Sequence, residues 1–100
     1  MMHYEEIQTG DELQLNIEGK IDTLSCDQFQ TLVLKSFTKC NRLIINMEKV
    51  AYMSSSGLRA LVLGNRTAES KGGRLTIINS PEQVMEVFRV TGMLDVLDIR

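Results

Sequence analysis

Short apolar runs alternate with segments of helical periodicity along this chain, and that alternation leaves few folds open. Residues 4–9 predict a first strand. After a turn signal at residues 10–11, apolar and polar side chains alternate over residues 13–17, which is typical of a half-buried strand. Residues 43–47 form a run that is apolar except at Asn46, and we expect a strand covered on both faces there. Residues 75–78 predict another buried strand, rich in β-branched side chains.

Helical segments are predicted between these strands. The first spans residues 25–39, because Ser25 and Gln28 resemble a capping box and apolar side chains follow at helical spacing. The second follows the serines at residues 54–56. Its inward face is predicted from three- and four-residue steps to comprise Leu58, Leu61, Val62, Asn65 and Ala68.

Glycines and a proline mark where the later elements end and begin. Lys71-Gly72-Gly73 ends the second helix with a cation and then glycines for a left-handed cap. Ser80-Pro81-Glu82-Gln83 begins a third helix, with a cap serine and proline at the first position, and Gly92 stops it. We expect residues 48–53 to form a connection with a strand-like stretch or a tight turn, and residues 93–99 a short helix or strand.

The predicted order of elements, β-β-α-β-α-β-α, implies an α/β fold with a mixed sheet of four to five strands and helices packed on it. One hundred residues suffice for one domain with its own core but not for two, so residues 1–100 are predicted to form a single domain. Apolar residues make up 43% of the chain and charged residues 24%, which is ordinary for a globular protein.

Composition also excludes several classes of partner. No apolar run approaches the roughly 20 residues that span a bilayer, and the N-terminus lacks a signal-peptide pattern, so we expect a cytoplasmic protein without membrane insertion. A formal charge of −2 without a basic block argues against nucleic acid as a direct partner. Cys26 and Cys40 are spaced unlike a zinc or redox pair, and we expect reduced thiols, one in the core and one near a helix end.

The run Ser54-Ser55-Ser56-Gly57 stands between a predicted buried strand and a predicted helix. A serine there can cap the helix, and the unpaired N–H groups and positive dipole of a helix start also suit a phosphate, bound or covalent. A catalytic serine would need a general base beside it, but the only histidine, His3, is expected in a frayed N-terminus. No nucleophile elbow, Walker loop or metal-ligand cluster is present. We therefore expect a binding module without metal or cofactor.

Residues 43–63, together with the segment Gly19-x-Ile21-Asp22, resemble the STAS domain of bacterial anti-sigma factor antagonists. The resemblance covers the element order of nearly the whole chain. It implies regulation of transcription by partner switching: the chain binds an anti-sigma factor that is also a serine kinase and so frees a sigma factor. Phosphorylation stops the binding, and a serine phosphatase reverses it. Ser55 takes the place of the phospho-acceptor, with Ser54 and Ser56 as less favoured acceptors, and Ser54 replaces the aspartate usual in the family.

The surface that a partner would contact is predicted around the same serines. The helix after them presents Arg59, Leu63 and Arg66 at three- and four-residue steps, away from its inward face. Leu63 is then either a lone surface residue or part of a docking patch. Asp22 and Thr23 lie in a loop that the family places near the phospho-acceptor, and capping the next helix is their alternative role. Ser54, Ser56 and Gly57 complete the predicted partner-binding set.

Two other functions remain open. A STAS domain can also be a non-phosphorylated accessory subunit of a transport or signalling complex, with the serines as caps. The serine run could instead bind a nucleotide or another free anion, although no base-stacking aromatic residue or nearby lysine supports this. The sequence does not determine the oligomeric state of the protein.

Overall fold

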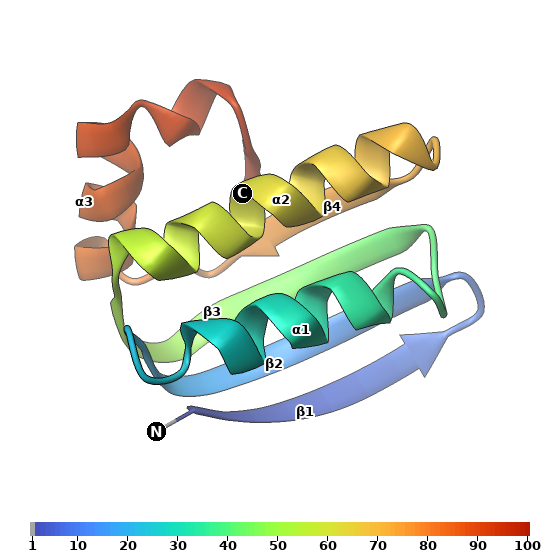
Figure 1. The fold of residues 1–100 in the computed structure, drawn as a ribbon, viewed down its shortest axis with the longest axis horizontal. Coiled ribbons are helices and arrows are strands. Elements are labelled where there is room, and N and C mark those ends of the chain that lie inside the picture. Colours follow the sequence, from blue (N-terminus) through green and yellow to red (C-terminus); the bar gives the residue numbers. More distant parts are fainter. Residues whose placement is uncertain (1) are drawn as a thin grey trace.

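The predicted strands lie side by side in a five-stranded sheet, which a computed structural model describes together with its helices over residues 2–100 (Figure 1). The sheet order follows the chain, β1-β2-β3-β4-β5. In chain order the elements are β1 (Met2–Thr9), β2 (Glu12–Ile21), α1 (Cys26–Ser36), β3 (Arg42–Met53), α2 (Ser55–Ser70), β4 (Arg74–Ile78), α3 (Glu82–Thr91), the 3₁₀ helix η1 (Met93–Asp95) and β5 (Asp98–Ile99).

The sheet is mixed, as predicted. β1 and β2 form an antiparallel hairpin around Gly10, whose φ of 61° is one that glycine adopts without strain. The pairs β2–β3, β3–β4 and β4–β5 are all parallel. Parallel strands end at the same edge of a sheet, so the connections that leave β2 and β3 start side by side.

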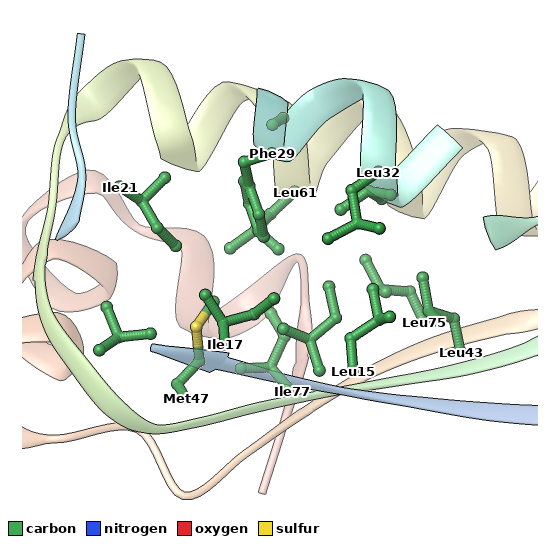
Figure 2. Close-up of a cluster of buried hydrophobic side chains, with 14 of the residues drawn as sticks. Leu15, Ile17, Ile21, Phe29, Leu32, Leu43, Met47, Leu61, Leu75 and Ile77 are labelled. Atoms are coloured by element: carbon green, nitrogen blue, oxygen red, sulfur yellow. The ribbon is translucent and has the colours of Figure 1, made fainter. Parts of the chain in front are cut away.

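The core lies between the sheet and the helices α1 and α2, which run across one of its faces (Figure 1). Figure 2 shows strand side chains such as Leu15, Ile17 and Ile77 pointing toward Phe29 and Leu61 of these helices. All five side chains are buried, with at most 1% of their surface exposed. Alternate residues of β2, of β4 and of the first half of β3 therefore form one continuous apolar layer.

The expectation that both faces of the central strands are covered is wrong. Ile44 and Asn46 of β3 and Thr76 of β4 lie on the other face and are only half-buried. Asn46 there donates to Asn16 Oδ1 and accepts from Asn79, so amide side chains form a hydrogen-bonded row on that face. The prediction made from residues 43–47 failed because Ile44 lies on the opposite face of the sheet from its buried neighbours.

Several predicted boundaries also differ. β3 continues without a break to Met53, where a connection was expected, and α1 is shorter than residues 25–39. His3 lies in β1 opposite Glu18, not in a frayed terminus. Ser25 is the N-cap of α1, as predicted, but its side chain makes none of the bonds of a capping box. The predicted cap of α3 is wrong, because Pro81 and not Ser80 is its N-cap.

The inward face of α2 is rotated from the predicted one toward small residues. Val62 and Asn65 are half-buried, whereas Ala60 and Gly64 are buried together with Leu58, Leu61 and Ala68. A Cβ on Gly64 would lie 2.5 Å from Val33 Cγ1 of α1. Close packing of the two helices therefore selects small residues, a preference that apolar periodicity does not report.

The glycine pair after α2 is required at both positions for different reasons. Gly72 has a φ of +73° and open space around it, as predicted for a left-handed cap. A Cβ on Gly73 would lie 2.0 Å from the backbone oxygen of Asn41, which accepts from the Arg74 N–H at 2.8 Å. The turn between α2 and β4 is thus held against the turn before β3.

We predict that Gly73→Ala lowers the free energy of unfolding by about 2–3 kcal/mol, because a backbone atom blocks the methyl group. Gly72→Ala is the matched control. It adds only the strain of a left-handed alanine, about 1 kcal/mol. Urea denaturation of both variants checks the order, and equal losses would contradict the packing argument.

Candidate functional site

Two connections meet at the carboxyl ends of β2 and β3. Ile21 pairs with Met53 at the last register position of the two strands, and the Ser54 N–H then donates to the Ile21 carbonyl at 2.8 Å. The loop from β2 to α1 and the junction of β3 with α2 therefore lie together, at the same end of the molecule in Figure 1. This brings the loop carrying Asp22 and Thr23 beside the three serines, as the resemblance to the STAS domain implied.

The three hydroxyls at the start of α2 have different surroundings. Ser54 is the N-cap, with extended backbone, and its Oγ accepts from the Gly57 N–H at 3.3 Å. Ser55 is the first helical residue and is exposed, whereas Ser56 is half-buried. One hydroxyl is therefore engaged in the cap, and the next one along faces solvent.

Gly57 has a structural role. It is buried, and a Cβ there would lie 2.6 Å from Ile21 Cγ2 and 3.0 Å from Met53 Cγ. The first turn of α2 thus rests directly on the ends of β2 and β3. Because Gly57 is buried, it is not available for the partner contact predicted from the sequence, and it instead fixes the position of Ser55.

The loop after β2 is held by Asp22 and Ser25. Asp22 Oδ1 accepts from the N–H groups of Leu24 at 3.0 Å and Ser25 at 3.2 Å. The buried Ser25 hydroxyl donates to the Lys20 carbonyl at 2.7 Å and accepts from the Asp22 N–H at 3.0 Å. The Asp22 side chain therefore orders the loop that leads into α1 without bonding to an N–H of that helix, and Thr23 stays exposed beside it.

Desolvation raises the pKa of Asp22, but the hydrogen bonds from the Leu24 N–H and from Ser25 outweigh it, so the pKa is lowered overall from 3.8. Hydrogen bonds to the ionised form of a carboxyl group favour that form. The carboxylate is thus the state that orders the loop at neutral pH.

The outer side of α2 carries the predicted arginines. Arg59 and Arg66 are exposed, and neither forms a salt bridge with any residue between 2 and 100. Leu63, expected beside them, is half-buried and therefore offers only part of its side chain to a partner. The first turn of α2 contains no acidic residue.

One exposed residue was missed from the sequence. Leu24, in the loop between Thr23 and Ser25, exposes 93% of its surface. Its only sequence signal is an apolar residue in a polar loop before the first helix. Within residues 2–100 no group of three or more histidine, cysteine, aspartate or glutamate side chains could hold a metal ion. No helix of that part is long and apolar enough to cross a membrane.

Comparison with known proteins gives consistent matches. Residues 4–100 match the STAS domain family. The chain is 30% identical over 92 residues to the anti-sigma-B factor antagonist of Bacillus subtilis strain 168, and the match covers 92% of this chain and 84% of that protein.

Two solved structures share the fold. SpoIIAA, an anti-sigma factor antagonist in its unphosphorylated form, gives a TM-score of 0.81 at 21% identity, covering 98% of this chain and 88% of that one. The Bacillus cell fate determinant SpoIIAA in its phosphorylated form gives a TM-score of 0.76 at 19% identity, covering 98% and 91%. At these identities the likeness concerns the arrangement of strands and helices.

We predict that the order of the β2–α1 loop depends on pH through Asp22. A lowered folded-state pKa means that the carboxylate stabilises the loop fully above about pH 4, and that this stabilisation is lost as the pH falls through the folded pKa. NMR amide shifts of Leu24 and Ser25 should stay constant from pH 5 to 8 and move only below that range. In Asp22→Asn the acid transition should disappear, and a transition near pH 6 would contradict the assignment.

Proposed function

Since the chain belongs to the STAS-domain family of anti-sigma factor antagonists, we propose that phosphorylation of Ser55 switches its binding to an anti-sigma factor. The chain is a binding module, not an enzyme. The anti-sigma factor itself is the serine kinase, and a serine phosphatase reverses the reaction. This exchange takes place in the cytoplasm and controls how much sigma factor is free for transcription.

One observation carries the proposal: only one residue in the run of three serines is exposed. Ser55 is exposed at the first position of α2, while Ser54 Oγ is bound to the Gly57 N–H and Ser56 is half-buried. A kinase must bring its nucleotide to within bonding distance of the hydroxyl that it modifies. Ser55 meets that requirement without unfolding the helix start, which makes Ser54 and Ser56 minor acceptors.

A phosphate on Ser55 is compatible with the fold. It adds about −1.5 to −2 charges at a helix N-terminus, where the dipole and the leading N–H groups favour an anion. No carboxylate in the first turn opposes it, and Arg59, one turn further on, has no salt-bridge partner within the described chain. The domain therefore stays folded when it is modified.

The same phosphate changes the surface that faces a partner. Ser55 directly follows Ser54, whose N–H donates to the Ile21 carbonyl, so the phosphate adds its charge at the edge from which the Asp22 loop also leaves. A partner shaped for the neutral hydroxyl would have to desolvate the phosphate or tolerate its repulsion, and either costs binding free energy. Binding is lost although the fold is retained.

Ser54 in place of the usual aspartate keeps one of the two properties of that residue. Its hydroxyl still caps α2 through the Gly57 N–H. It carries no charge, so the acceptor lacks a carboxylate immediately before it. We infer that the cognate kinase recognises a neutral residue at this position.

We predict that Ser55→Ala removes phosphate incorporation by the cognate kinase, and that Ser55→Asp weakens binding of the anti-sigma factor at least tenfold with the fold unchanged. Phosphopeptide mapping and isothermal titration calorimetry measure the two effects. Ser56→Ala is the control and should be labelled like the wild type. Ser54→Ala should also be labelled, although loss of its cap costs about 1 kcal/mol of stability. Persistent labelling of Ser55→Ala would refute the assignment. Unchanged affinity of Ser55→Asp would favour the accessory-subunit function.

We also predict that Arg59 lowers the second pKa of phosphoserine 55. An ion pair four residues apart on a helix stabilises by about 0.3–0.5 kcal/mol, which corresponds to about 0.2–0.4 pKa units. A ³¹P NMR titration of phosphorylated Arg59→Gln should therefore give a higher phosphate pKa than the phosphorylated wild type. Arg66→Gln, two turns further along the same helix, should leave the phosphate pKa unchanged, and an equal shift in both variants would exclude a local pair.

A further inference from the structure

Leu24 is exposed to a degree that sets it apart from the other leucines. It exposes 93% of its surface, whereas Leu94 exposes 41% and every other leucine of residues 2–100 is buried or half-buried. A single exposed apolar side chain is common on a protein surface and by itself indicates nothing. Two further observations indicate a role for Leu24: the hydrogen bonds that fix the backbone around it, and its location beside Ser55.

The loop holds Leu24 outward. Its own N–H donates to Asp22 Oδ1 at 3.0 Å, and Ser25, the next residue, is 5% exposed and bound to the Lys20 carbonyl. On the other side Ile21 is fully buried in the core. Because the residues around it are fixed, the backbone at Leu24 cannot turn its side chain into the protein without breaking these hydrogen bonds. The side chain is therefore presented in advance of binding.

The location of Leu24 links it to the phosphorylation switch. Three residues before it, the Ile21 carbonyl accepts from the Ser54 N–H, so the loop and the start of α2 share one edge of the molecule. The exposed residues Thr23 and Ser55 lie on that edge as well. A partner that covers Ser55 is thus in position to cover the loop.

We propose that Leu24 is the apolar anchor of this surface and inserts into an apolar pocket of the anti-sigma factor. The inference rests on the proposed function and adds a specific contact to it. The anti-sigma factor is the occupant because it must cover Ser55, which shares this edge with the loop. A second copy of the chain is an outcome of the test below. The partner pocket is apolar, with polar groups at its rim that face Thr23.

A rigid anchor gains affinity at low entropic cost, because little freedom is lost when it binds. Burying a leucine side chain is worth enough free energy to change a dissociation constant by about ten- to a hundredfold. The anchor is also separate from the phosphate: it supplies affinity from the loop, whereas Ser55 carries the regulation on the helix.

The test measures binding of the purified cognate anti-sigma factor by isothermal titration calorimetry. Leu24→Ala should raise the dissociation constant at least tenfold and leave the urea midpoint unchanged, because the side chain has no contacts to lose. In the kinase reaction it should raise KM and leave kcat close to that of the wild type, since it contributes docking only. Val90→Ala, a 73% exposed residue on α3, is the matched control and should bind like the wild type.

The outcomes separate this inference from the proposed function. If Ser55→Asp weakens binding but Leu24→Ala does not, the anchor is wrong and the switch stands. If neither variant changes the affinity, both are wrong. If sedimentation shows a wild-type dimer that Leu24→Ala dissociates, a second copy occupies the site and the assignment to the anti-sigma factor is overturned.

Discussion

The parallel pairing of β2 with β3 is the constraint on which the site depends. It ends at Ile21 and Met53, and one further hydrogen bond, from the Ser54 N–H to the Ile21 carbonyl, extends it into the connections. Without that pairing, Asp22 and Ser54 would be 32 residues apart along the chain, with no contact to bring them together. With it, they form one surface, and Gly57 lets α2 rest directly on the strand ends. The site therefore depends on the register of the sheet and on a glycine, with no side chain, at position 57.

The serine hydroxyls at this surface differ in burial and hydrogen bonding, and these differences separate structural serines from the proposed phospho-acceptor. Ser25 is buried and closes the Asp22 loop, and Ser54 caps α2. Neither hydroxyl is free, and each satisfies backbone groups that would otherwise remain unpaired. The Ser55 hydroxyl makes no such hydrogen bond within the described chain, so a phosphate can be added there without removing a bond that the fold needs. This difference explains how one serine in a run of three could be phosphorylated while Ser54 keeps its hydrogen bond at the start of α2.

The sequence predicted the order of elements, because hydrophobic periodicity and helix punctuation are local signals. The meeting of Asp22 with the serines was implied only by the resemblance to the STAS domain. Prediction from the residues failed where the deciding contact is distant in sequence. Ile44 and Val62 are apolar, yet they lie off the buried faces because the position of α1 determines which side of each element is covered. Ser80 has the sequence of a cap, but its hydroxyl is buried and finds no hydrogen-bond partner within the described chain, since α3 begins one residue later. Leu24 escaped notice because exposure cannot be read from the sequence of one loop.

In the proposed function, regulation through Ser55 and affinity through Leu24 fall on different secondary-structure elements, and this separation has a physical advantage. If the phosphate had to displace the anchor to stop binding, it would have to break the hydrogen bonds of Asp22 and Ser25 that hold the loop. A charge on the neighbouring helix needs only to make the shared surface unfavourable for the partner, and it leaves the loop ready for binding once the phosphate is removed. The unmodified chain therefore does not have to refold before it binds again. Reversal of the switch is then limited by removal of the phosphate and not by a conformational step in this domain.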